Sequence, residues 1–112
     1  MLARKALNPT RYGPVSAAIM DELADGQWHT VESAIGAGAL AVMPGFSIRR
    51  AGGATGDPAR DAVLRGTGDR LVARNNLERM RRRGRVERDT TKVRLSLDAA
   101  ASWAVHRQDQ TS

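Results

Sequence analysis

Apolar side chains recur at helical spacing in the first third of the chain. Val15, Ile19 and Leu23 follow Pro14 in steps of about one helical turn, as on the buried face of an amphipathic helix. Proline is favoured in the first turn of a helix, and Gly26 is a residue type that commonly follows the last turn. The pattern therefore predicts a helix from Pro14 that ends before Gly26.

A second helix is expected after a short extended piece at residues 28–29. Thr30 is a residue type that caps helix N-termini, and apolar residues then continue at helical spacing until the proline and glycine at 44–45. Gly36 and Gly38 weaken this helix relative to alanine. We expect them to allow close approach of another helix.

The stretch 46–67 is rich in glycine and predicts irregular structure with short helical pieces. A turn of helix and a glycine-rich loop are expected over 46–56. Asp57 and Pro58 form a good cap and first-turn pair for a short helix over 58–65. The glycines at 66–68 are expected to break the chain before the next helix.

Residues 69–83 predict the helix that carries most of the positive charge. Ala73, Leu77 and Met80 form one apolar stripe, and Gly84 stands where a C-terminal cap is expected. The opposite face presents Arg74, Asn75, Glu78 and Arg82.

Alternation with a period of two follows, and predicts a β-hairpin over residues 85–97. Val93, Leu95 and Leu97 fall on one side of its second strand, and the sequence RDTTK supplies a polar turn. Asp98 is expected to cap a closing helix.

The segment 98–112 is expected to form a C-terminal helix and tail. Trp103 in this helix should pack on the domain or on a second copy of it, so a homodimer through the C-terminal helix is one expected assembly.

Charge is distributed unevenly along the 112 residues. Residues 65–94 hold eleven basic and four acidic side chains, although the whole chain has a net charge of +6. The sixteen arginines suit bidentate contacts with phosphates and base edges, but a GC-rich coding genome produces the same bias. With no cysteine and no long apolar run, we expect a cytoplasmic protein with no membrane partner.

Catalytic and metal-binding patterns are not evident in the sequence. His29 and His106 have no metal-ligand neighbours at useful spacing, and the paired carboxylates suit helix caps and solvated faces. We therefore expect no enzyme activity, metal or cofactor.

The order of predicted elements resembles the winged helix-turn-helix family of DNA-binding domains. The stretches LADGQWHTVESAI and LVARNNLERMRRRGRVER carry this resemblance, which covers residues 14–97 after a flexible arm at 1–13. Family members usually join the second helix to the recognition helix by a tight turn, whereas in this chain the segment 43–67 lies between them. It is either an insertion, or residues 58–65 supply the helix that precedes the recognition helix. In the overall character of its sequence, including the bias toward arginine, the chain is also similar to small winged proteins of actinobacteria and their phages.

The resemblance implies an α+β, mostly helical winged helix-turn-helix fold with a two-stranded wing and a C-terminal helix. It further implies sequence-specific binding of double-stranded DNA by a small, nucleoid-associated transcriptional regulator. The helix at 69–83 would enter the major groove, and the wing at 85–97 would contact the backbone or minor groove. The alternatives are a phage excisionase or other architectural DNA-binding protein, and a protein-interaction module that binds an acidic partner. The expected DNA contacts are Arg70, Arg74, Asn75, Arg79 and Arg82 on the helix, and Arg88, Lys92 and Arg94 on the wing.

Overall fold

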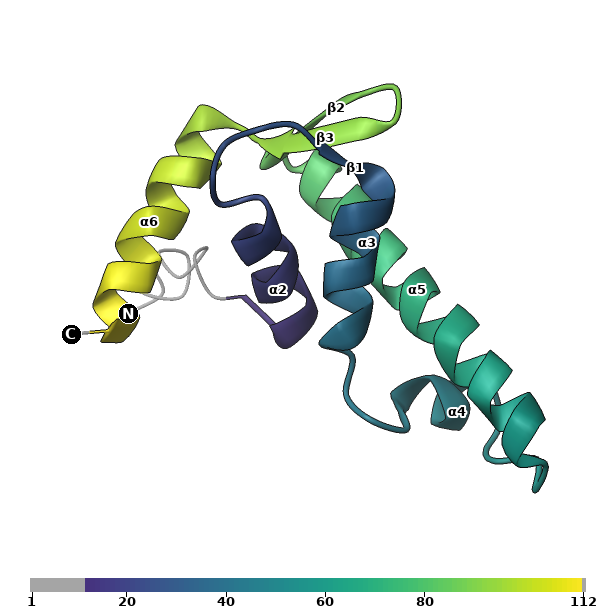
Figure 1. The fold of residues 1–112 in the computed structure, drawn as a ribbon. Coiled ribbons are helices and arrows are strands. Elements are labelled where there is room, and N and C mark those ends of the chain that lie inside the picture. The colour runs from purple at the N-terminus through teal and green to yellow at the C-terminus, as the bar shows by residue number, and fades with distance from the viewer. Residues whose placement is uncertain (1–11, 112) are drawn as a thin grey trace.

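The described chain is mostly helical and contains one small antiparallel sheet (Figure 1). A computed structural model describes residues 12–111, the last two by their backbone. The expected α+β class is confirmed. The elements are α2 (Pro14–Glu22), β1 (His29–Thr30), α3 (Val31–Leu40), α4 (Phe46–Arg50), α5 (Pro58–Arg82), β2 (Val86–Asp89), β3 (Lys92–Leu95) and α6 (Leu97–Thr111).

The first two helices begin where the sequence predicts. α2 starts at Pro14, and the Thr30 hydroxyl caps α3 by accepting the N–H of Ser33 at 3.1 Å. The N–H of Val31 donates to the carbonyl of Thr91 at 2.8 Å, which ties the start of α3 to the hairpin. α3 ends at Leu40, before the proline that was expected to end it.

α5 is one continuous helix, so the break expected at residues 66–68 is wrong. The Asp57 carboxylate caps its start by accepting the N–H of Ala59 at 3.1 Å, as predicted. The two glycines at 66 and 68 do not have the positive φ of a break, and a glycine inside a helix costs only about 1 kcal/mol relative to alanine. α4 packs against this part of α5, and the Ser47 hydroxyl donates to Asp69 at 2.6 Å.

Residues 58–65 are therefore the first turns of α5 and not a separate helix before it. The alternative in which residues 58–65 form a separate helix before residues 69–83 is wrong, because both stretches belong to α5. The segment between α3 and α5 is shorter than the expected 43–67, since α5 already begins at Pro58.

The core lies where α2, α3, α5, α6 and one face of the sheet meet. The predicted stripe of Ala73, Leu77 and Met80 is buried, with each side chain at most 6% exposed. Gly38 lets α3 approach α5 closely, because a Cβ at this position would lie 2.9 Å from the Cβ of Ala73. None of the described helices is both long and apolar enough to cross a bilayer.

The sheet has the order β1-β3-β2, so β1 pairs with the second strand of the hairpin. Val93 and Leu95 are buried as expected, but Leu97 is 89% exposed. The prediction for Leu97 is wrong because β3 ends at Leu95 and α6 begins immediately. The Ser96 hydroxyl caps α6 by accepting the N–H of Ala99 at 3.2 Å, a role expected for Asp98.

The turn from α5 into the hairpin depends on Gly84, as predicted. Its φ of 77° is in the left-handed region. The N–H of Gly84 donates to the carbonyl of Arg81 and the N–H of Arg85 donates to that of Met80, both at 3.0 Å, which is the Schellman pattern. Figure 1 shows the result: the hairpin lies at one end of α5, while the first turns of α5 project beyond α3 beside α4.

Candidate nucleic-acid interface

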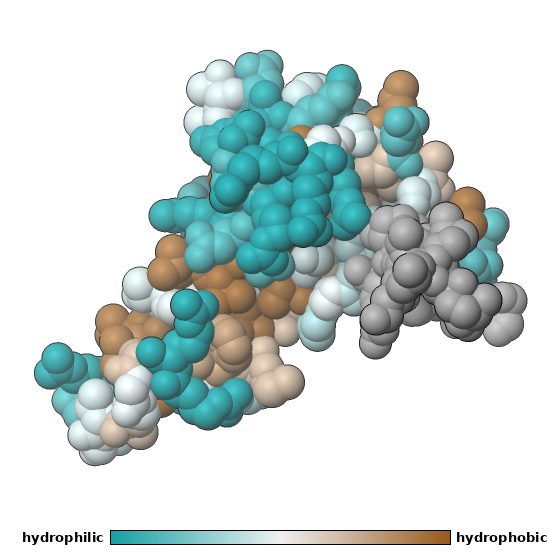
Figure 2. Space-filling view, turned by 180° about the vertical axis from the view of Figure 1, so that it is seen from behind, coloured by the Kyte–Doolittle hydropathy of each residue, from teal (hydrophilic) through white to brown (hydrophobic). Residues whose placement is uncertain are grey.

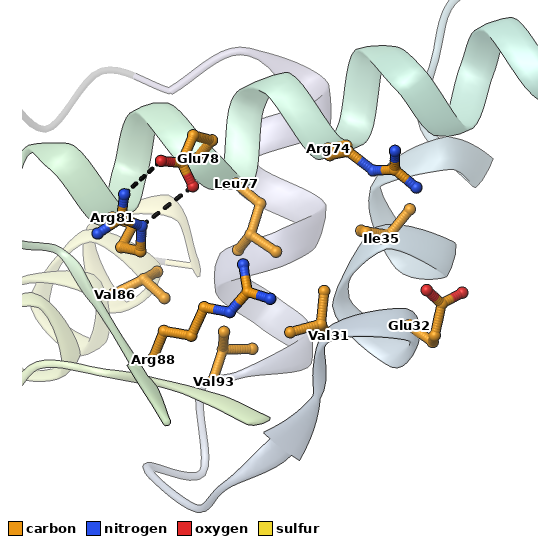
Figure 3. A pocket seen from close by; sticks show the side chains of 10 residues that line it. All are labelled: Val31, Glu32, Ile35, Arg74, Leu77, Glu78, Arg81, Val86, Arg88 and Val93. Carbon is orange, nitrogen blue, oxygen red and sulfur yellow. Dashed lines mark hydrogen bonds and ion pairs between the residues drawn. The ribbon is translucent and has the colours of Figure 1, made fainter. Parts of the chain in front are cut away.

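A pocket of about 290 Å³ lies between the start of α3, the second half of α5 and the hairpin (Figure 3). Its apolar lining belongs to the edge of the core, and its rim is charged. Three arginines and two glutamates reach it. The apolar lining residues are Val31, Ile35, Leu77, Val86 and Val93, and the charged ones are Glu32, Arg74, Glu78, Arg81 and Arg88.

The arginines converge because of helix and strand periodicity. Arg74 and Arg81 are seven residues apart, about two turns, and so lie on the same flank of α5. Arg88 is paired in register with Val93, and both point to the core side of the sheet. Figure 3 shows the Arg88 side chain rising from the hairpin toward Leu77 of α5.

Carboxylates orient some of these cations. The Arg81 Nε donates to Glu78 Oε2 at 3.0 Å, and its Nη2 donates to the other carboxylate oxygen. This pair lowers the pKa of Glu78 and raises the pKa of Arg81. Beside the pocket, Arg70 pairs with Glu32 at the start of α3.

Arg74 is the pocket's most available cation. Within residues 12–111, no carboxylate pairs with it, and its side chain lies at the open edge of the pocket near Ile35. Arg88 uses its Nε to donate to the carbonyl of Thr90 at 3.0 Å. The guanidinium groups of Arg74 and Arg88 can therefore approach the same ligand from a helix and from a hairpin.

The other predicted contacts on α5 lie on different faces of the helix. The Arg82 side chain is 71% exposed and lies 3.9 Å from Glu78. Asn75 borders an apolar groove beside α4, and Arg79 lines a separate cavity next to α2. The structure thus brings Arg74 and Arg88 into one pocket and places these three residues outside it.

Lys92 and Arg94 lie on the outer face of the sheet, opposite Arg88. The Arg94 Nε donates to Glu87 at 2.8 Å, and its guanidinium lies 4.5 Å from the ring centre of Trp28. Lys92 is paired in register with Asp89. The hairpin therefore presents basic side chains on both faces.

The sequence prediction omitted Arg81, which shares the pocket with Arg74. Its seven-residue spacing from Arg74 was the available signal, but three consecutive arginines at 81–83 obscured it. Arg83 and Arg85 were also omitted. They line the cavity that contains Arg79.

Within the described part of the chain, no group of three His, Cys, Asp or Glu side chains is placed to hold a metal ion. Comparison of the chain with protein-family models, curated proteins and solved structures gives no match.

Proposed function

We propose that this protein binds double-stranded DNA sequence-specifically as a small transcriptional regulator of the winged helix-turn-helix type. The observation that carries the proposal is the convergence of Arg74 and Arg81 from α5 with Arg88 from the hairpin on one pocket. A helix and an adjacent hairpin that share a basic surface can contact a major groove and its flanking phosphates together.

The order and pairing of the elements support this fold. α2, β1, α3, α5, β2 and β3 follow one another as helix one, strand, helix two, recognition helix and wing, with β1 paired to β3. In this assignment α4 and its flanking loops are an insertion before the recognition helix. α6 closes the core, and a homodimer through its outer face is part of the proposal.

The exposed side of α5 supplies the contacts to DNA. Arg74 and Asn75 are suited to guanine and adenine edges, with Arg70 beside them once Glu32 is displaced. Arg79, Arg82 and the wing residues Arg88, Lys92 and Arg94 would contact phosphates. Figure 2, which views the molecule from behind, shows hydrophilic residues gathered over its middle and hydrophobic residues between them and the projecting end.

Salt-dependent binding of duplex DNA tests the proposal. Affinity is measured by fluorescence anisotropy with duplex fragments of the source genome. The logarithm of the binding constant should fall linearly with the logarithm of the salt concentration, with a slope of about −0.9 per phosphate contact. Arg74→Gln should reduce discrimination between sequences, by about 1 to 3 kcal/mol at the contacted base. Lys92→Gln should weaken binding to all sequences alike and lower the salt slope.

Arg107→Gln is the matched control, since it removes the same charge from α6, away from the pocket. It should leave both affinity and salt slope unchanged. Absence of binding, or tight binding that does not respond to salt, would refute DNA binding.

A second candidate is a protein-interaction module, favoured by an apolar groove of about 320 Å³ between α4 and α5. Leu64 and Leu71 line it, and Leu71 is 53% exposed. A partner retained after nuclease treatment, and lost in Leu71→Glu, would favour this function. Strong bending of bound DNA on circularly permuted fragments would instead favour the excisionase or architectural role.

A further inference from the structure

A second cavity, of about 340 Å³, lies on the other flank of α5, between its last turns and the start of α2. It is separate from the pocket that contains Arg74, because different faces of α5 line the two. The polar side chains around it are Tyr12, Ser16, Asn76, Arg79, Arg83 and Arg85.

The lining of this cavity has three positive charges and no carboxylate among the described residues. Arg79 and Arg83 are one turn apart on α5, and like charges at this spacing repel each other. Arg85 is positioned over the ring of Tyr12, with its guanidinium 5.0 Å from the ring centre. The first pocket differs, because Glu32 and Glu78 lie among its arginines.

The backbone of α2 adds to the positive potential. Its first turn contains no acidic residue, and no side chain caps its N-terminus. The first N–H groups of a helix have no acceptor within it, and Val15 and Ser16 of this turn line the cavity. The Ser16 hydroxyl donates to Asn76 Oδ1 at 3.0 Å, so the neutral polar groups are already oriented.

We propose that this cavity is a phosphate-binding site. Two arginine forks and a helix N-terminus converge there, and both groups favour phosphate oxygens. The phosphate comes either from a DNA backbone or from a small phosphorylated molecule. The site shares Arg79 with the proposed DNA-binding surface but does not include Arg74, so the two proposals can be tested separately.

NMR of the full ¹⁵N-labelled chain tests the site directly. Inorganic phosphate is titrated against chloride at constant ionic strength, while the amides of Val15 and Ser16 and the Nε–H signals of Arg79 and Arg83 are followed. Saturable shifts are expected at these groups. Arg83→Gln should weaken phosphate binding about tenfold, as expected for loss of one charge-assisted pair.

Arg60→Gln is the matched control, since it removes the same charge from the other end of α5 and Arg60 does not line the cavity. It should bind phosphate as the wild type does. Shifts that do not saturate, or an equal loss in Arg60→Gln, would overturn the proposal.

Addition of a short duplex then identifies the source of the phosphate. Displacement of inorganic phosphate by the duplex assigns the site to the DNA backbone, and retention assigns it to a small phosphorylated ligand. Arg74→Gln separates the two proposals, because it should impair DNA binding and leave the phosphate shifts intact.

Discussion

At the scale of single residues, two glycines of α3 differ in their surroundings although they are two positions apart. A Cβ on Gly38 would lie 2.9 Å from the Cβ of Ala73 and 3.1 Å from a side-chain carbon of Ile19. A Cβ on Gly36 would have nothing within 4 Å. The Cβ of Ala73 cannot rotate away, so α3 and α5 would have to separate to accommodate a larger residue than Gly38.

Gly38→Ala should therefore destabilise the fold by about 1 to 3 kcal/mol, the usual cost of overpacking. Gly36→Ala, the matched control, should stabilise it by up to about 1 kcal/mol through helix propensity. Urea unfolding of both variants measures the free energies. Equal effects of the two substitutions would contradict the close approach of α3 to α5.

Asp61 has an acid-sensitive contact with the loop before α5. The N–H of Thr55 donates to its carboxylate at 2.9 Å and the Thr55 hydroxyl donates at 2.8 Å. Both hydrogen bonds lower the pKa of Asp61, and the bond from the Thr55 N–H has the larger effect. Because the folded pKa is the lower one, the stabilisation is fully present above the ordinary pKa of about 3.9 and is lost as pH falls through the folded value.

An NMR titration of the Asp61 carboxyl carbon should thus show a midpoint below that of an ordinary aspartate. Thr55→Val removes the hydroxyl bond and keeps the N–H bond, so it should raise the midpoint part of the way back. A midpoint at or above the ordinary value in the wild type would show that the contact does not form.

At the scale of elements, α4 is attached to α5 through Gly68. A Cβ at this position would lie 2.6 Å from the Cβ of Ser47, whereas one at Gly66 would have nothing within 4 Å. Gly68→Ala should displace α4, break the hydrogen bond from Ser47 to Asp69, and lower the free energy of unfolding by about 1 to 3 kcal/mol. Gly66→Ala should raise it by up to about 1 kcal/mol.

Amide hydrogen exchange across residues 46–50 measures the attachment directly. Faster exchange is expected in Gly68→Ala and unchanged exchange in Gly66→Ala. Unchanged exchange in both variants would show that α4 does not need this close contact.

Local signals in the sequence were sufficient to predict the start or end of an element where a single residue determines it. Pro14, Thr30, Asp57 and Gly84 act at their predicted positions because caps and first turns depend on neighbouring backbone groups. The continuity of α5 through Gly66 and Gly68 could not be predicted, because it depends on the packing of α4. Packing between helices also decides which glycine of α3 lies at a helix contact. The sequence predicted both Gly36 and Gly38 there, and only Gly38 lies against α5.

The sequence was enough to predict that arginines form the candidate site, but it could not predict which of them lie together. Helix periodicity placed Arg74 on an exposed face, but the position of Arg88 beside it depends on the register between β2 and β3. A one-residue shift of β2 against β3 would turn Arg88 to the outer face of the sheet, the face that carries Lys92 and Arg94. The pairing of Arg70 with Glu32 depends on the packing of α3 against α5, which no local pattern specifies.

At the scale of the whole molecule, α6 closes the core through Trp103. This side chain is 2% exposed, and its indole N–H donates to Asp21 of α2 at 3.0 Å. Tyr12 packs its ring edge against it, with 5.1 Å between ring centres. Trp103 thus joins the last helix to the first described one within a single chain, and a dimer through α6 would use its outer face, where Val105 is 57% exposed.

Trp103→Ala should therefore destabilise the protein by about 3 to 5 kcal/mol, a large share of the 5 to 15 kcal/mol typical of a domain. Trp103→Phe retains most of the ring and loses the hydrogen bond to Asp21, so its cost should be smaller, about 1 to 3 kcal/mol. Thermal unfolding at protein concentrations about tenfold apart checks the origin of the loss. Because Trp103 packs within its own chain, the difference in Tm between each variant and the wild type should not depend on concentration. A difference that grows with concentration would instead place Trp103 in a contact between two copies.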